Sequence, residues 1–499
     1  MLFFYEYIIY IIEMPKRCVS TCKQFPKSEC NPPRCRYIDG SQRKYCRISY
    51  KYKMNPGNCR VTRRYKKGEI RPAAKNKIRQ FLNRSGRILS IVCSKSGECL
   101  AFGKRISEIN SLFKGFVGFE YALDSIKEIG KPSVNGFNKQ ITYERNGYKA
   151  NTILKSSQNP EADNLVYEYI VGTKFVNRMI RRFPCFLETY GLYFYKSPIY
   201  WRMMREHQPH WKNILDRLEL QKSINYKKAC EQSTYAAILI QHISASSVLD
   251  DFISGGYFNN VIQYDLIYVL FIIYQALSSL SKQFTHYDLH ANNVLLYEPT
   301  PGKYIQYNYH LEGGEIISFR CRYIPKIIDY GRSFFDNGNT NGKGIYDKVC
   351  STNACDYCGE DYGFAWLDPN SEYGICSSKK NESHDLRLLK IIHNNLNSKM
   401  DDEPENDTYQ SLYSILRKVK YGVGIDNSDE KQFGTRENTT LHPNGEVIAN
   451  VTDAYSQLKR HILKKELIDE NQAQYSDPSK QIGILHIYAN GNPMVYEGL

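Results

Sequence analysis

The sequence predicts an α+β fold, and three stretches carry this prediction. Residues 140–148 alternate apolar and polar positions, as expected for a half-buried strand, and residues 150–156 (A-N-T-I-L-K-S) read as the next strand after the turn signal Asn146-Gly147. Residues 261–280 carry apolar side chains on nearly every helical face, which is typical of a buried helix. From about Leu112 onward, the chain therefore has the composition of a mixed fold.

Length and charge suggest more than one part. The 499 residues, of which 42% are hydrophobic, are enough for a large core and for about two to four domains. The formal net charge of +15 is unevenly spread: residues 1–110 hold 25 Lys and Arg against 7 Asp and Glu, whereas the rest holds 42 against 45. The basic character therefore belongs to the first fifth of the chain.

Residues 1–110 form a basic, cysteine-rich N-terminal region with interleaved tyrosines. A small zinc-stabilised module and a nucleic-acid-binding patch are both compatible with it, as is a plain solvated basic face. Its cysteines form no C-x-x-C pair, and the 15 cysteines of the whole chain are irregularly spaced. Free thiols or metal ligands are therefore expected rather than a disulfide framework. The cysteines of this region are Cys18, Cys22, Cys30, Cys35, Cys46, Cys59, Cys93 and Cys99.

The N-terminus makes a poor secretory signal. Residues 1–14 are apolar for about a dozen positions, carry Glu6 and Glu13, and lack a basic start and a small-residue cleavage site. Met14 opens M-P-K-R-C, a more ordinary start, so the initiation site is open between Met1 and Met14. No apolar run approaches the ~18 residues needed to cross a bilayer. We expect a protein that is not secreted and has no transmembrane segment.

A degraded glycine-rich turn comes first among the functional candidates. Residues 126–137 read I-K-E-I-G-K-P-S-V-N-G-F, and Gly130, Ser133 and Gly136 fall where two strands would fold over phosphates and expose backbone N–H groups to them. An ordinary β-hairpin is the alternative. Lys155 ends the apolar part of the next strand, where a lysine is either solvated or reaches toward phosphates.

Such a lysine needs an anion to hold it in place. Asn159-Pro160 and Asp163 are helix-start residues, and the helix that follows carries Glu168 near its middle. Glu168 is preferred over Glu161 as the partner, because an acid at a helix start more often serves the helix dipole. Further on, residues 236–243 (A-A-I-L-I-Q-H-I) read as a central strand that leads into a linker at residues 244–247.

The most informative stretch is residues 285–297, T-H-Y-D-L-H-A-N-N-V-L-L-Y. Phosphoryl transfer from ATP needs a carboxylate beside the attacking hydroxyl and an oxygen ligand that holds Mg²⁺ against the phosphates. Asp288 would take or orient the hydroxyl proton, and Asn293, five positions later and directly before a buried strand, would turn its oxygen toward the metal. The pattern H-x-D-L-x-x-x-N is specific.

A second element, a metal-binding carboxylate, is expected from a neighbouring strand end. Residues 324–332 read I-P-K-I-I-D-Y-G-R, where Asp329 follows an apolar pair and Gly331 permits a sharp turn. Residues 333–380 then form a long segment, and Asp385 opens a helix after it. The long segment contains four cysteines that could bind Zn²⁺, with unpaired thiols as the alternative: Cys350, Cys355, Cys358 and Cys376.

This ordered set of motifs resembles the eukaryotic-like protein kinase family over roughly residues 118–400. The reading D-L-H-x-N-N and the basic, cysteine-rich head look like the serine/threonine kinases of giant, mimivirus-like DNA viruses of amoebae. The resemblance implies a bilobal fold: a small β-rich N-lobe at residues 118–243, and a larger, mainly helical C-lobe at 244–499 with an activation-type segment at 329–380. It also implies a location in the host cytoplasm or the virion.

The resemblance further implies ATP- and Mg²⁺-dependent (or Mn²⁺-dependent) phosphorylation of Ser or Thr in protein substrates. Asp288 would be the catalytic base and Asn293 and Asp329 the metal ligands. Lys155 would contact the phosphates with Glu168 as its clamp, and the glycine-rich turn would cover them. His286 and Tyr330 would be packing residues, and Asp385 would hold the catalytic loop from below.

Two departures from the family pattern leave alternatives open. Tyr287 replaces the usual Arg before Asp288, so control through that Arg is not expected. His290 replaces the usual Lys two positions after Asp288, as also occurs in aminoglycoside and choline phosphotransferases, so a small-molecule phosphotransferase is the first alternative. A nucleotide-binding pseudokinase is the second, although Lys155, Asp288, Asn293 and Asp329 are all retained.

Overall fold

The computed structural model divides the chain into two compact units, Met1–Arg84 and Ser85–Leu499. It describes residues 17–19, 27–30, 35–39, 44–48, 60–62, 100–129, 136–146, 148–157, 165–206, 212–225, 235–243, 246–338, 377, 380–399, 403–419 and 447–498. The N-terminal unit contains two small antiparallel pairs, β1 (Arg17–Val19) with β4 (Arg60–Thr62) and β2 (Cys35–Asp39) with β3 (Lys44–Ile48).

The cysteines among the described residues only partly match the expectation of free thiols or metal ligands. Cys185 and Cys321 are free and buried in the second unit. Cys30, in the N-terminal unit, is buried and disulfide-bonded, so the expectation of free thiols or metal ligands does not hold for this residue.

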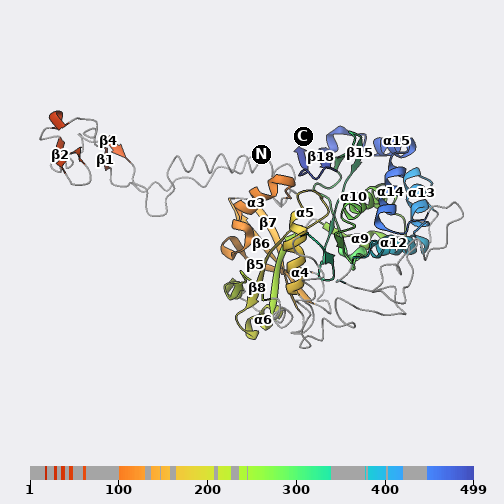
Figure 1. The fold of residues 1–499 in the computed structure, drawn as a ribbon, viewed down its shortest axis with the longest axis horizontal. Coiled ribbons are helices and arrows are strands. Elements are labelled where there is room, and N and C mark those ends of the chain that lie inside the picture. Colours follow the sequence, from red (N-terminus) through yellow and green to blue (C-terminus); the bar gives the residue numbers. More distant parts are fainter. Residues whose placement is uncertain are drawn as a thin grey trace. The chain divides into compact units, whose positions relative to one another are not determined.

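The first part of the second unit contains an antiparallel six-stranded sheet in the order β5-β6-β7-β10-β8-β9. Figure 1 labels its strands β5, β6, β7 and β8. β10, the predicted central strand, lies between β7 and β8, and the helix α4 packs across β10 and β8. The strands are β5 (Ala122–Glu128), β6 (Gly136–Arg145), β7 (Tyr148–Ser157), β8 (Thr189–Tyr195), β9 (Leu218–Leu220) and β10 (Ala236–His242). The helices of this part are α3 (Ile106–Leu112), α4 (Leu165–Val171), α5 (Asn177–Met179), α6 (Pro198–Arg205) and α7 (Lys212–Leu215).

α4 and α5 belong to one continuous helical stretch. A π-helical turn, Gly172–Val176, joins them, and Gly172 is packed against Thr189 of β8. A Cβ atom at position 172 would lie 2.2 Å from the Thr189 hydroxyl, so only glycine fits there without a shift. The absence of a side chain therefore lets the helix lie close to the sheet.

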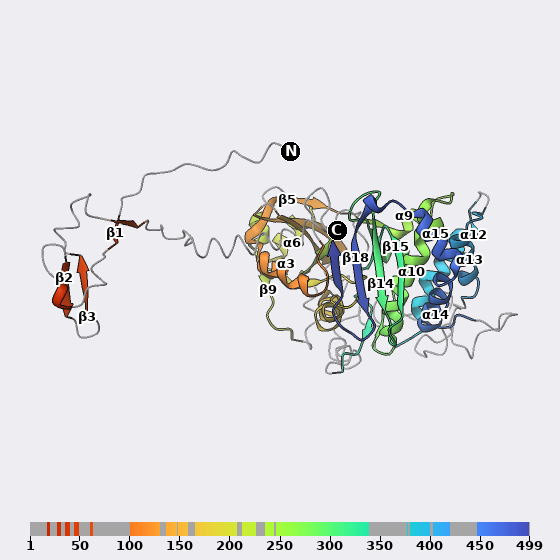
Figure 2. The same cartoon turned by 90° about the horizontal axis from the view of Figure 1, so that it is seen from above.

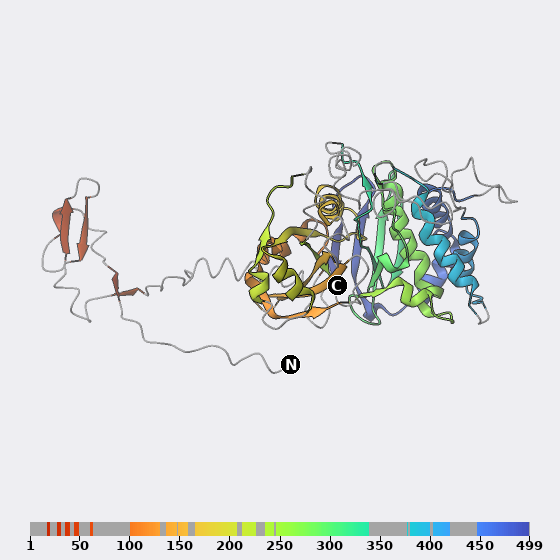
Figure 3. The same cartoon turned by 90° about the horizontal axis from the view of Figure 1, so that it is seen from below.

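The rest of the second unit is organised around α10 (Leu266–Ser279) and the π-helical turn Val261–Asp265 before it. Every residue from Leu266 to Leu277 is buried, as the apolar pattern predicts. Figures 2 and 3 show α10 between a four-stranded sheet and the helices at the far end of the unit, and it contacts α13, α14 and β15. The surrounding helices are α9 (Leu249–Ile253), α12 (Arg387–Asn397), α13 (Asp407–Leu416), α14 (Val451–Ile462) and α15 (Lys465–Gln474).

Three smaller sheets complete this part. β11-β13-β16 and β12-β17 are antiparallel and surround the predicted catalytic stretch, while the four-stranded sheet has the order β15-β14-β18-β19 with β14 and β18 parallel. The strands are β11 (Ser246–Val248), β12 (Phe284–Thr285), β13 (Val294–Tyr297), β14 (Tyr304–His310), β15 (Ile316–Cys321), β16 (Ile324–Ile327), β17 (Phe334–Phe335), β18 (Gln481–Tyr488) and β19 (Val495–Gly498).

The fold changes two expectations. Charge composition assigned residues 100–110 to the basic, cysteine-rich N-terminal region. In the structure they belong to the second unit, where Leu100 and Phe102 are part of the hydrophobic core. The stretch Val261–Ser279 is long and apolar enough to cross a membrane, although no such run was expected, and 83% of its most apolar window is buried inside the protein. Burial gives this helix an internal packing role in the second unit.

Candidate active site

The loop between β12 and β13 carries Asp288 and Asn293, and its conformation is strained. Tyr287, directly before Asp288, has a backbone φ of 64°, a value that residues other than glycine rarely adopt. The carboxylate of Asp385 accepts hydrogen bonds from the backbone N–H of His286 (2.8 Å) and of Tyr287 (3.0 Å). Asp385 is buried, so these two bonds fix the turn from inside the protein.

Burial also shapes the ionisation of this anchor. It raises the pKa of Asp385 to about 7, although the two N–H donors favour the ionised form and oppose the shift. The 3-10 turn His384–Leu386 and the start of α12 position the residue. The predicted role of Asp385 beneath the loop agrees with these contacts.

The Asp288 carboxylate is surrounded by basic groups. Arg387 Nη1 lies 3.2 Å from Oδ1, His290 Nε2 lies 3.4 Å from the same oxygen, and Arg332 Nε lies 3.8 Å from Oδ2. The Asp288 side chain keeps 13% of its surface exposed, so it lies at the edge of solvent. Burial lowers the pKa of His290, although Asp288 opposes the shift, so this imidazole is neutral near pH 7.

Asn293 is tied back to the same loop. Its amide nitrogen donates a hydrogen bond to the Asp288 carbonyl oxygen (2.8 Å) and lies 3.1 Å from His290 Nε2. The amide oxygen is therefore turned away from that carbonyl, as a metal-binding role requires. The backbone N–H of Ile328 donates to the Asn293 carbonyl oxygen (3.0 Å), which connects this loop to the residue before Asp329.

Asp329 follows β16 and is the second strained residue of the site, with a φ of 66°. Lys155 Nζ donates to Asp329 Oδ1 at 2.9 Å across a separation of 174 residues. Partial burial alone would raise the pKa of Asp329, but the charges of Lys155 and Arg332 hold this pKa at about 2, so the carboxylate is ionised at neutral pH. Its side chain is 41% exposed and thus open to a ligand.

Lys155 also pairs with Glu168, the residue preferred over Glu161. Its Nζ donates to Glu168 Oε2 at 2.7 Å, from β7 to α4, and the Glu168 side chain is buried. Glu168, Lys155 and Asp329 thus form one chain of ion pairs that links the six-stranded sheet, its helix and the end of β16. Glu161 lies outside the described residues.

His286 and Tyr330 connect the two carboxylate-bearing loops. The His286 Nε2 atom lies 3.0 Å from the Ile328 carbonyl oxygen, and the His286 and Tyr330 rings meet edge to face at 5.8 Å. Tyr330 donates from its hydroxyl to the Ile327 carbonyl oxygen (2.6 Å) and accepts from the Leu187 N–H (3.2 Å). Burial lowers the pKa of His286 to about 4, which keeps it neutral, and both residues are packing residues as predicted.

Of the other predicted site residues, only Gly136 lies in the part of the chain that the structure describes. Gly136 starts β6, where a Cβ atom would lie 2.6 Å from the Ser156 carbonyl oxygen, so it permits close approach to β7. Gly130 and Ser133 lie outside the described residues, as do Cys350, Cys355, Cys358 and Cys376. Within the part of the chain that the structure describes, no three His, Cys, Asp or Glu side chains form a metal-binding group. Mg²⁺ needs less, because one or two protein ligands and substrate phosphates commonly hold it.

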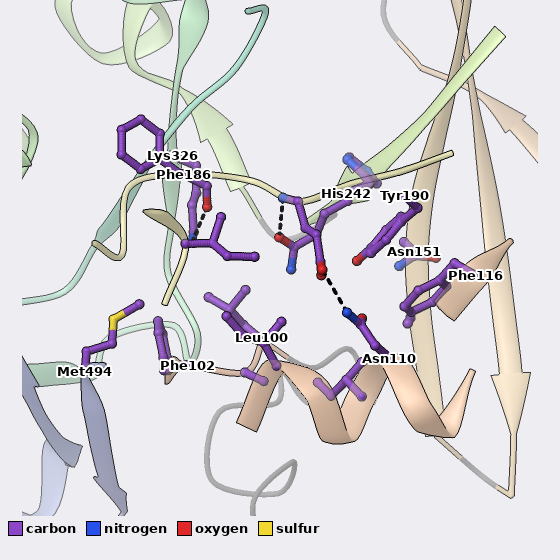
Figure 4. Close-up of a pocket in the computed structure, with 17 residues that line it drawn as sticks. Leu100, Phe102, Asn110, Phe116, Asn151, Phe186, Tyr190, His242, Lys326 and Met494 are labelled. Atoms are coloured by element: carbon purple, nitrogen blue, oxygen red, sulfur yellow. Dashed lines mark hydrogen bonds between the residues drawn. The ribbon is translucent and has the colours of Figure 1, made fainter. Parts of the chain in front are cut away.

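A small cavity of about 30 Å³ lies apart from these residues, between α3, β10 and the end of β16 (Figure 4). Figure 4 shows Lys326 and Phe186 at one side and Asn110 at the other, where Asn110 donates to Glu188 (2.8 Å). Burial raises the pKa of Glu188 to about 7 and lowers that of Lys326 to about 8. The space suits a water molecule or two, and none of the predicted site residues lines it.

Sequence reasoning missed Arg332 and Arg387, the two arginines beside Asp288. Arg332 directly follows Gly331, and Arg387 comes two residues after Asp385, so both adjoin motifs that are recognisable in the sequence. Their approach to Asp288 depends on tertiary structure, and no local pattern reports it. Comparison with known proteins adds no constraint: no protein-family model matches the chain, and no curated protein is significantly similar to it.

Proposed function

We propose that this chain is an ATP-dependent protein kinase that phosphorylates Ser or Thr, with a bilobal arrangement of an N-lobe at residues 118–243 and a C-lobe at 244–499. The observation that carries the proposal is the meeting of Lys155, Glu168 and Asp329 in one ion-pair chain. Asp288 and Asn293 lie on the adjoining loop, which Ile328 and His286 connect to it. These residues come from distant parts of the sequence and have the types that phosphoryl transfer needs.

The side chains suit distinct roles in this reaction. Asp329 is ionised and exposed, and Asn293 presents an amide oxygen, so the pair fits as ligands for Mg²⁺. Bound Mg²⁺ would neutralise charge on the triphosphate. Lys155 would contact the phosphates while Glu168 holds it in place, and Asp288 would orient the acceptor hydroxyl and receive its proton.

The retained residues favour an enzyme over a pseudokinase. Loss of one of Lys155, Asp288, Asn293 or Asp329 would mark an inactive site, and all four are present. Gly331 and the long segment at residues 333–380 favour a protein acceptor, whereas His290 is the residue that favours a small-molecule acceptor.

One assay separates these activities. The full chain is incubated with labelled ATP, Mg²⁺ or Mn²⁺, and a panel of proteins, small alcohols and amines, beside Asp288→Asn. We expect label on Ser or Thr of protein, with turnover in the variant lower by roughly 10² to 10⁴ and nucleotide affinity nearly unchanged.

Two other outcomes would contradict the proposal. Label only on small molecules would indicate the phosphotransferase alternative, and nucleotide binding without transfer would indicate the pseudokinase. Wild-type turnover in Asp288→Asn would show that the role assigned to Asp288 is wrong.

A further inference from the structure

Two arginines from different elements meet at the candidate catalytic carboxylate. Arg332 lies just after Gly331, and Arg387 is the first residue of α12. Arg387 Nη1 reaches Asp288 Oδ1 at 3.2 Å, and Arg332 Nε lies 3.8 Å from Oδ2, so the carboxylate stands between two guanidinium groups. The arginine side chains are 19% and 25% exposed, which leaves both accessible from solvent.

Arg332 also belongs to the segment that carries the second carboxylate. It follows Asp329 by three residues, just after β16. Arg332 thus connects the segment of Asp329, the proposed metal ligand, to the carboxylate of Asp288, the proposed base. The phosphoryl group must pass between the base and the metal, so Arg332 borders its path.

We propose that Arg332 and Arg387 are catalytic residues that bind the phosphoryl group during its transfer. The inference rests on the proposed kinase function and deepens it. In the step, the acceptor hydroxyl oxygen forms a bond to the γ-phosphorus of ATP, and the bond from that phosphorus to the β–γ bridging oxygen breaks. Its electron pair leaves with ADP, and the hydroxyl proton passes to the Asp288 carboxylate.

Distances support this role. An acceptor oxygen that donates a hydrogen bond to Asp288 lies about 2.7 Å from a carboxylate oxygen. A guanidinium 3.2 Å from that carboxylate is then within reach of the oxygens on the phosphorus under attack. A guanidinium has five N–H donors, so it can contact Asp288 and a phosphoryl oxygen together.

The two arginines would also supply the loop with a fixed positive charge. Arginine stays protonated at any pH at which proteins are folded. Fixed positive charge at the transferring group lowers the barrier because charge develops on the phosphoryl oxygens in the transition state.

The test is steady-state kinetics on the full chain with two degenerate peptide mixtures centred on serine. Flanking positions contain neutral residues only in one mixture, and include Asp and Glu in the other. The variants are Arg332→Ala, Arg387→Ala and Arg387→Lys, with Arg460→Ala, an exposed arginine on α14, as the control for lost charge.

We expect each alanine variant to lower kcat about 10²-fold or more on both mixtures, with KM for ATP and for peptide changed less than about threefold. Arg387→Lys keeps the charge and should recover part of the loss, and Arg460→Ala should behave as wild type. The lysine variant also keeps the test valid if Arg387→Ala fails to fold, which loss of nucleotide binding would reveal.

Three results would overturn the inference, and each leads to a different conclusion. Unchanged kcat in both alanine variants would remove the arginines from catalysis. A rise in KM confined to the acidic mixture would show that they recognise an acidic substrate residue instead. A wild-type chain that phosphorylates neither mixture would contradict the proposed function itself.

Discussion

At the scale of single residues, the candidate site depends on charges placed against one another. Lys155 lies between two carboxylates, those of Glu168 and Asp329, and so neutralises acids that would otherwise repel a triphosphate. Asp288 lies between two arginines. Each carboxylate that is proposed to act thus has a cationic partner from a distant part of the chain.

Lys155→Met should weaken binding of Mg²⁺-ATP by about tenfold or more, equivalent to roughly 1.4 kcal/mol, because two acids would then face the phosphates. Lys149→Met is the matched control, since Lys149 lies on the same strand with a 44% exposed side chain. Titration calorimetry with the full chain measures both. Equal affinity in the two variants would show that Lys155 does not contact the nucleotide.

Lys326 makes a separate prediction about stability. Its side chain is buried with one hydrogen bond, to the Phe186 carbonyl oxygen (3.2 Å), and burial lowers its pKa to about 8 from an ordinary value near 10.5. Between pH 8 and 10.5 the unfolded chain therefore binds more protons at Lys326 than the folded chain does. Below pH 8 the charged ammonium lowers the free energy of unfolding, and this cost disappears as the pH rises toward 10.5.

Lys326→Met should therefore raise the free energy of unfolding at pH 7 by roughly 1 to 3 kcal/mol, after allowance for the lost hydrogen bond. The gain should shrink between pH 8 and pH 10. Urea unfolding at several pH values measures it. A variant that is less stable than wild type at pH 7 would mean that the buried ammonium has a stabilising anionic partner.

At the scale of elements, the helix that carries Glu168 depends on its contact with β8. Gly172 begins the π-helical turn, and a Cβ atom there would lie 2.2 Å from the Thr189 hydroxyl and 2.7 Å from Thr189 Cβ. A side chain at position 172 would push α4 from the sheet and carry Glu168 away from Lys155.

Gly172→Ala should lower the free energy of unfolding by roughly 1 to 3 kcal/mol, the usual cost of overpacking, and should weaken nucleotide binding as well. Gly118→Ala is the control, because that glycine has open space around its Cβ position and a φ of −123°. Thermal unfolding with and without Mg²⁺-ATP reports both effects. Equal behaviour of the two variants would contradict the packing argument.

Elements with strong local patterns are predictable from the sequence. β13 and β16 coincide with short apolar runs, α10 with an apolar pattern on all faces, and the final hairpin of β18 and β19 with the turn at Asn490-Gly491. Residues 186–195 are less regular: β8 covers Thr189–Tyr195, and Phe186 and Leu187 are buried in the loop before it.

The site was predictable to the same extent. Asp288, Asn293 and Asp329 lie in local motifs at strand ends, so each of them can be identified from the sequence as a candidate site residue. Arg387 meets Asp288 across 99 residues, and its approach depends on how α12 packs beneath the loop. Charge composition likewise assigned residues 100–110 to the N-terminal region. A count of charged residues does not show which apolar residues are buried, and Leu100 and Phe102 are part of the hydrophobic core of the second unit.

At the scale of the whole molecule, the candidate site belongs entirely to the unit Ser85–Leu499. Removal of residues 1–84 should therefore leave Mg²⁺-ATP affinity and the midpoint of thermal unfolding of the remaining chain within error of the full-length values. Nucleotide titration and calorimetry of residues 85–499 measure this. A shortened chain that aggregates or loses nucleotide binding would mean that the N-terminal unit is needed to form the site.

The central claim is that Asp329 and Asn293 hold one metal ion against a triphosphate that Lys155 and Asp288 also face. A crystal structure of the full chain with Mn²⁺ and a non-hydrolysable ATP analogue tests this most directly, because the anomalous signal locates the metal. We expect the ion at about 2.1 Å from a carboxylate oxygen of Asp329 and from the amide oxygen of Asn293, with the γ-phosphate facing Asp288. A nucleotide bound elsewhere, or a metal ion that touches neither side chain, would contradict the account.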